Sequence, residues 1–136
     1  MRSWARGLTS CFALFLLTNL FIISSRAQQP GFRGAPASAT ADKNPYAGSA
    51  AAAANGKKLY AQSCAQCHGN NMQGMGPAPA LDTASVRNAR AGELFWFITT
   101  GKLSSGMPSW SQLSKQQRWQ LVTFLESQSR QKTATK

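Results

Sequence analysis

The chain of 136 residues is poor in several residue types, and each shortage excludes a class of protein. It has one histidine, His68, which excludes metal sites built from three imidazoles and proton relays that need two. It has three cysteines, too few for a structural zinc site made of two cysteine pairs. Four acidic side chains stand against 15 lysines and arginines, a net charge of +11. The chain is also too short for a multidomain enzyme or a large barrel.

Residues 1–27 have the pattern of an export signal. A basic start is followed by an apolar stretch from Cys11 to Ile23 and by small residues before position 28. The alternative is an uncleaved anchor. Counted from Leu8, however, the apolar stretch has 16 residues, and about 20 are needed to span a membrane. We therefore expect an exported, periplasmic protein whose remaining 109 residues (136 less 27) form one domain.

Residues 28–49 are rich in alanine, proline, glycine and serine. They hold too few large apolar side chains to offset the entropy of ordering, so a flexible tether is expected there. Residues 50–130 are predicted to be the folded domain and residues 131–136 a disordered tail. Without the signal the chain keeps 12 of the 15 basic side chains and all four acids, a net charge of +8. Such a charge implies an anionic partner: an acidic protein surface, a membrane face or nucleic acid.

Cys64, Cys67 and His68 lie together in the string CAQCHG. A zinc site would lack ligands, a thioredoxin-type pair would lack its strand–helix–strand unit, and a disulfide across so small a loop would stabilise little. The fourth explanation is covalent attachment of haem c. The two thiols add to the vinyl groups of the porphyrin, and the adjacent imidazole becomes an axial ligand of the iron. Only this explanation gives all three residues a role, so one haem per chain is predicted.

The motif resembles that of the monohaem class I c-type cytochromes. The string GKKLYAQSCAQCHG (residues 56–69) follows the N-terminal helix and haem-attachment pattern of that family. Similar strings continue in PAPAL (77–81), GMPSW (106–110) and LSKQQRWQLVTFL (113–125). The resemblance extends over about residues 50–130. It implies an all-α fold, a small cytochrome c-like domain of about three to four helices wrapped around one covalently bound haem c.

The second axial ligand cannot be another histidine, which leaves the methionines. Met72 and Met75 follow His68 so closely that the chain would have to cross to the opposite haem face almost at once. Met107 lies 39 residues after His68 and precedes a proline. In the resembled family such a Met-Pro step carries the axial sulfur, although methionines more often fill gaps in a core. His68 and Met107 are therefore the predicted iron ligands, and an iron with both positions filled is suited to electron transfer.

Other haem contacts are implied by the resemblance. In that family a Pro-Xaa-Leu segment supplies the carbonyl that orients the histidine, and Pro79 fits this role better than Pro77. Trp96, Phe97 and Trp110 are candidates for the haem wall, and the alternative for them is ordinary core.

Three helical segments are expected. The first runs from about residue 49 to 63, where an alanine run favours helix. Gly56 within it suggests close approach by another element, which in the resembled family is the C-terminal helix at the position of Phe124. Residues 93–100 are apolar all round and could be a buried strand, but the resemblance favours helix. The last helix begins with a capping box at Ser114.

The favoured hypothesis is an exported carrier, not an enzyme, that passes single electrons between larger redox proteins. Its scattered basic side chains would steer it to acidic docking surfaces, unless they serve only solubility. A second hypothesis is a dedicated cytochrome subunit of an enzyme complex, such as a quinoprotein dehydrogenase or a terminal oxidase. A third, a non-redox module that binds nucleic acid, is opposed by the export signal and by CAQCHG. A monomer is expected, with membrane contact only through partners or an uncleaved signal.

Overall fold

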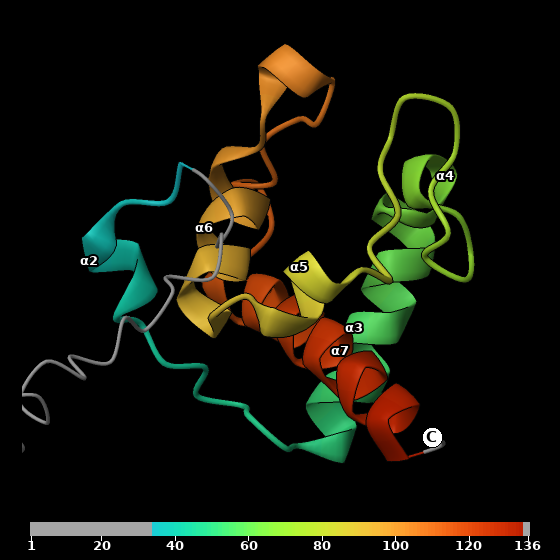
Figure 1. Cartoon of the computed structure of the whole chain (residues 1–136). Helices are drawn as coiled ribbons and strands as arrows, with labels where there is room; N and C mark the ends of the chain where they lie inside the picture. The colour runs from blue at the N-terminus through green and yellow to red at the C-terminus, as the bar shows by residue number, and fades with distance from the viewer. Residues whose placement is uncertain (1–33, 135–136) are drawn as a thin grey trace, which may run out of the picture.

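A computed structural model describes residues 34–134 and shows an all-α arrangement (Figure 1). Three longer helices form the frame, and three helices of four or five residues join or cover them. The helices are α2 (Ala37–Thr40), α3 (Ala50–Ser63), α4 (Ala65–His68), α5 (Ala84–Asn88), α6 (Ala91–Thr100) and α7 (Lys115–Ala134), with the 3₁₀ turn η2 (Leu103–Ser105) before α7. Within these residues only isolated bridges and no strands occur. The all-α prediction is confirmed, while the predicted signal lies outside the described residues.

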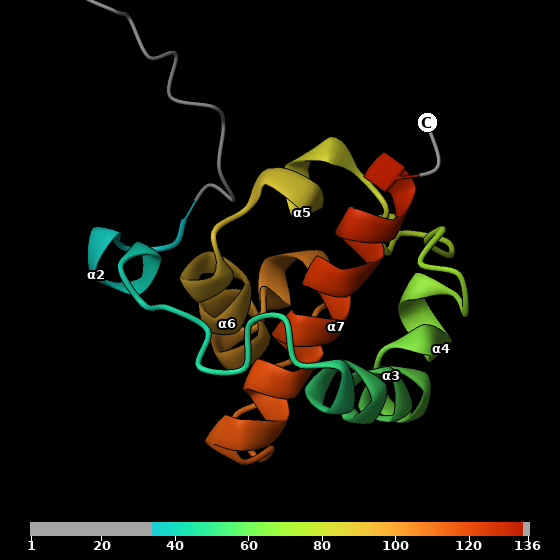
Figure 2. The same cartoon turned by 90° about the horizontal axis from the view of Figure 1, so that it is seen from below.

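The two longest helices, α3 and α7, cross in close contact (Figure 2). A β-carbon on Gly56 would lie 2.0 Å from the carbonyl oxygen of Gln120 and 2.8 Å from Cβ of Phe124. One turn further along α3, the Tyr60 ring lies 5.4 Å from the Phe124 ring, centroid to centroid. A glycine weakens a helix interior by about 1 kcal/mol relative to alanine. Here its missing side chain brings two helix axes together, as the sequence predicts.

The apolar segment predicted at 93–100 is helix α6, and it is covered on several sides. Leu94 and Ile98 are buried in the core. Phe95 stacks on Trp119 of α7, with ring centroids 4.1 Å apart. The helix begins two residues earlier than expected because the Glu93 side chain accepts a hydrogen bond from the backbone N–H of the residue before Ala91. No helix among residues 34–134 is long and apolar enough to cross a membrane.

Residues 34–49, here called the N-terminal strap, are ordered against the domain although the sequence predicts a tether. Helix α2 packs on α6 so closely that a β-carbon on Gly92 would lie 1.8 Å from the Ala39 carbonyl oxygen. The buried Asn44 side chain donates to Thr123 Oγ1 at 3.0 Å and to Glu126 Oε2 at 2.9 Å. Close backbone contact and a paired buried amide hold this segment. Composition alone does not reveal either, because both depend on residues far along the chain.

Helix α7 also extends beyond its predicted end. It runs to Ala134, into the predicted tail at 131–136. Glutamine, arginine, lysine and alanine, which make up much of this last part, are good helix formers. The predicted boundary at 130 therefore falls within a continuous helix.

Candidate functional site

The attachment motif occupies the short helix α4, directly after α3. Cys64 separates the two helices, and its carbonyl accepts bonds from the backbone N–H groups of Cys67 (3.1 Å) and His68 (2.9 Å). Both thiols are free, Cys64 half-buried and Cys67 exposed. The tight turn places two thiols and one imidazole within a single helical turn, which is the arrangement that attachment to one porphyrin requires.

The His68 ring is oriented by one hydrogen bond. Its Nδ1 lies 2.8 Å from the carbonyl oxygen of Pro79. A carbonyl oxygen can only accept, so the proton is on Nδ1 and the lone pair is on Nε2. The ring is buried, at 9% exposure. Of the two prolines that the sequence offers for this contact, the structure uses Pro79, and Nε2 is left as the nitrogen able to bind a metal.

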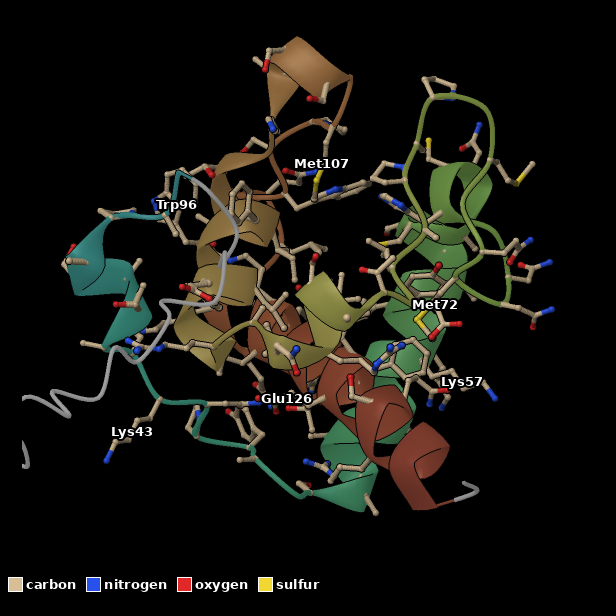
Figure 3. All side chains as sticks on the ribbon, viewed as in Figure 1. Lys43, Lys57, Met72, Trp96, Met107 and Glu126 are labelled. Atoms are coloured by element: carbon tan, nitrogen blue, oxygen red, sulfur yellow. The ribbon has the colours of Figure 1, made fainter. Side chains whose placement is uncertain are left out.

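The loop between His68 and Pro79 is held by backbone contacts. The Tyr60 hydroxyl donates to the Gly69 carbonyl at 2.7 Å. Met72 has a positive φ of 60° and accepts from the N–H groups of Leu81 (2.9 Å) and Asp82 (3.3 Å). Its side chain is buried beside α3, away from Met107 (Figure 3). The Met72 carbonyl thus holds the end of the loop, at Leu81 and Asp82, next to its beginning. The sequence around Met72 does not predict this role.

Met107 lies across the site on the loop between α6 and α7. Its backbone pairs with Lys102 in both directions, at 2.8 and 3.2 Å. The pairing closes a tight loop in which Gly106 takes a φ of 79°. Figure 3 shows the Met107 side chain directed into the space between this loop and the α4 segment. A thioether and the His68 imidazole are therefore presented from two separate segments of the chain.

The Met107 loop is tied to the end of α6. Ser109 Oγ donates to the Thr99 carbonyl at 2.7 Å, and the Trp110 N–H donates to the Ile98 carbonyl at 3.0 Å. Trp110 itself packs, half-buried, against the core. These bonds tie the residues directly after Pro108 to the end of α6, so the position of Met107 depends on that of α6.

Arg118 is a supporting residue that sequence reasoning treats only as a surface charge. Its guanidinium donates to Thr99 Oγ1 at 2.7 Å and lies 5.0 Å from the centre of the Phe95 ring. Its Nε is buried without a partner. A cation in the first turn of a helix opposes the helix dipole. This unfavourable position in the sequence is the one sign that Arg118 is kept for its contacts with Thr99 and Phe95.

Two of the three predicted haem-wall residues, Trp96 and Phe97, lie near the N-terminal strap, and their place in a haem wall stays a prediction. Trp96 is one turn from Gly92 and lies on the side of α6 that faces α2 (Figure 3). Phe97 packs edge-on against Trp96 at 4.9 Å, and a β-carbon on Gly34 would lie 3.8 Å from its ring. Sequence periodicity could not separate these faces, because residues 94–98 are five consecutive apolar positions. Of the three aromatics, Trp110 is the one on the loop that carries Met107.

Burial changes the acidity of two groups at this site. It raises the pKa of the Cys64 thiol to about 11, and the neighbouring Cys67 adds to the shift. Burial likewise raises the pKa of the Tyr60 phenol to about 12, with Cys64 as the smaller cause. Both groups are therefore neutral at physiological pH. Neither Cys64 nor Tyr60 therefore adds a buried charge to the site.

The donor set fits haem c and does not fit a cluster metal site. Among residues 34–134 no three His, Cys, Asp or Glu side chains come together to hold a metal ion. One nitrogen and one thioether sulfur are the axial pair of an electron-transferring haem iron. The two free thiols, Cys64 directly before α4 and Cys67 within it, are available for covalent attachment.

The family that the chain matches agrees with the haem c site inferred from these side chains. The sequence model of the family described as cytochrome c oxidase, cbb3-type, subunit III matches residues 51–125, more than half of the chain. The chain belongs to this family of c-type cytochromes. Family membership implies haem c with its iron, and an electron-transfer role.

A solved structure supports the same fold. The chain is similar to cytochrome cL from the marine methylotrophic bacterium Methylophaga aminisulfidivorans MPT, with a TM-score of 0.55 and 25% sequence identity. The match covers 73% of this chain and 71% of that one. No curated protein sequence matches the chain significantly. This c-type cytochrome therefore shares its helical frame with a known cytochrome.

Proposed function

We propose that this c-type cytochrome is an exported single-haem carrier that passes one electron at a time between larger redox proteins. The observation that carries the proposal is the His68–Pro79 hydrogen bond, which leaves the His68 Nε2 able to bind iron. Met107 would supply the second ligand. When bound, the haem supplies an iron that changes charge by one electron. With both axial positions filled by protein, O₂ and peroxide would have no coordination position.

The side chains of the site have distinct tasks. Cys64 and Cys67 hold the cofactor covalently, so the carrier keeps it when it moves between partners. His68 and Met107 are both fixed by backbone contacts, through the Pro79 carbonyl and the Lys102 pairing. Ligands held in place in this way move little when the iron changes charge. A small rearrangement between the two oxidation states favours rapid electron exchange.

A visible spectrum tests the proposal. The exported protein is examined oxidised and reduced, in the native state and after denaturation and acid–acetone extraction. We expect haem that stays with the polypeptide, a narrow α-band in the reduced state and a weak sulfur-to-iron band in the oxidised state. A colourless protein, or haem that leaves on extraction, would refute the assignment of Cys64 and Cys67.

The second candidate function is a dedicated cytochrome subunit of an enzyme complex. It is favoured by the description of the matching family, which names a subunit of an oxidase. Purification under mild conditions separates the two functions. A free carrier is recovered as a monomer, whereas a subunit is recovered in a complex of fixed stoichiometry.

A further inference from the structure

The loop that carries Met107 leaves the last turn of α6 and returns to it. The returning segment lies so close to the end of this helix that a β-carbon on Gly101 would come within 2.5 Å of the Pro108 carbonyl oxygen. The Thr99 carbonyl is one of the last four of the helix, which lack partners within it. It accepts a hydrogen bond from the Ser109 hydroxyl at 2.7 Å. A shift of this turn would therefore move the Met107 loop.

The Arg118 side chain joins the same turn to α7. Its guanidinium donates to Thr99 Oγ1 at 2.7 Å, and this hydroxyl donates in turn to the Phe95 carbonyl, also at 2.7 Å. Since arginine only donates, the single proton of the hydroxyl is free for the carbonyl. The guanidinium also lies 5.0 Å from the centre of the Phe95 ring, which stacks on Trp119. Arg118 thus contacts one whole turn of α6.

The charge of Arg118 suits the end of α6 better than the start of α7. A helix is partially positive at its amino end and partially negative at its carboxyl end. Arg118 is the fourth residue of α7, where a cation is unfavourable, and it contacts Thr99, the last residue but one of α6, where a cation is favourable. Its Nε is also buried without a partner, which costs free energy. The contacts with α6 therefore have to offset both effects.

We propose that Arg118 is a positioning residue for the second iron ligand. It holds the last turn of α6 against α7, and that turn fixes the loop that presents Met107. The inference rests on the proposed function, in which Met107 binds the iron. Arg118 acts through Thr99, whose hydroxyl accepts from the guanidinium and whose carbonyl accepts from Ser109. Without this connection the loop would leave the iron more often, and an added ligand would bind there more readily.

Imidazole binding to the oxidised holoprotein tests the proposal, because added imidazole binds the iron only when Met107 has left it. The apparent dissociation constant is measured from the loss of the weak sulfur-to-iron band. Arg118→Met removes the charge and keeps an apolar stem along the Phe95 ring. Thr99→Val removes the hydroxyl and keeps the branched shape, whereas Thr99→Ser keeps the hydroxyl.

Two controls separate this role from effects of charge and of global stability. Lys115→Met removes a cation from the same first turn of α7, but from an exposed side chain. Gly56→Ala introduces steric overlap at the crossing of α3 and α7, so it destabilises the fold without touching α6. Urea unfolding records the stability of every variant.

We expect Arg118→Met and Thr99→Val each to bind imidazole at least about fivefold more tightly than the parent, because hydrogen bonds from a charged donor are among the stronger ones. The double variant should bind no more tightly than the more affected single variant, since both substitutions break the same connection. Thr99→Ser, Lys115→Met and Gly56→Ala should bind imidazole as the parent does.

Binding at the parent's affinity by a folded Arg118→Met, or by Thr99→Val, overturns the proposal. An equal gain in Gly56→Ala also overturns it, because the effect would then follow global stability. If Arg118→Met does not fold, Thr99→Val decides alone. A parent protein without covalent haem or without the sulfur-to-iron band refutes the proposed function. A parent with both, whose variants are indifferent, refutes only the role of Arg118.

Discussion

The hydrogen bond from His68 to Pro79 fixes more than the orientation of a ring. It assigns the proton to Nδ1 and so leaves a lone pair on Nε2 at every pH where the ring is neutral. The acceptor is a backbone carbonyl, which no side-chain substitution removes. The contact depends on the path of the loop, and Met72 and Tyr60 hold that path.

Replacing Met107 tests the second ligand. We expect Met107→Ala to keep its covalent haem, become high-spin and bind added ligands, because one axial position opens. The loss of a thioether should also lower the midpoint potential by about 0.1 V or more, since axial ligands move haem potentials over about 0.8 V. Absorption spectra and redox titration measure both effects. Met75→Ala is the control and should keep the parent spectrum. An unchanged spectrum in Met107→Ala would show that Met107 is not the iron ligand.

The buried Tyr60 phenol should make the free energy of unfolding fall at alkaline pH. Its pKa is raised on folding from 10.0 to about 12 by burial, so the folded state holds the phenol proton more tightly than the unfolded state does. This contribution is complete below pH 10 and is lost as the pH rises to about 12. Urea unfolding of the holoprotein across this range should show the fall, and Tyr60→Phe should reduce it. With Cys64 bound to haem as proposed, burial, the larger cause, would carry the shift alone.

At the scale of the elements, the crossing of α3 and α7 depends on one missing side chain. Gly56→Ala should lower the free energy of unfolding by about 1–3 kcal/mol, because the new methyl group overlaps the Gln120 carbonyl. Helix propensity alone predicts the opposite, a gain of about 1 kcal/mol. Asn55→Ala, at the exposed neighbouring position, is the control and should be neutral or stabilising. Denaturant unfolding of the two variants decides between steric overlap and propensity.

The N-terminal strap is held to α7 by Asn44, which offers a second test. Asn44→Ala leaves Glu126 and Thr123 without this donor and should cost about 1–3 kcal/mol. Asn44→Asp keeps the shape but faces Glu126 with a second carboxylate, so it should be less stable still at pH 7. Equal stability of both variants and the parent at pH 7 would mean that the strap is not anchored here.

The elements differ in how far their sequence predicts them. Local signals were sufficient for α3 and for the start of α7, where Ser114 and Gln117 form the expected capping box at 2.8 and 3.2 Å. For α6 they left a strand open, and the resemblance favoured helix. The ordering of the strap was not predictable, because Asn44 is paired with residues about 80 positions later. The direction in which Trp96 points was not predictable either, because it lies within five consecutive apolar residues, 94–98.

At the scale of the whole molecule, we expect the cofactor to complete the core. A short chain supplies limited apolar burial, and the described loops meet around His68 and Met107. We therefore expect His68→Ala to yield a largely unfolded protein without haem. Far-ultraviolet circular dichroism of this variant, beside the parent, measures the helix content. A fully helical His68→Ala chain would show that the polypeptide packs without its cofactor.

The bond between Asn44 and Thr123 joins residues 79 positions apart, so the two ends of the domain meet in the finished molecule. Synthesis delivers a chain from its N-terminus, and contacts between distant residues form last. The strap, α3 and CAQCHG are therefore available before α7 exists to cover them. In an exported chain that crosses the membrane from its N-terminus, Cys64 and Cys67 would emerge while α7 is still missing. Arrival of the last helix would then close the domain, so the thiols would be most accessible to haem before the chain is complete on the far side.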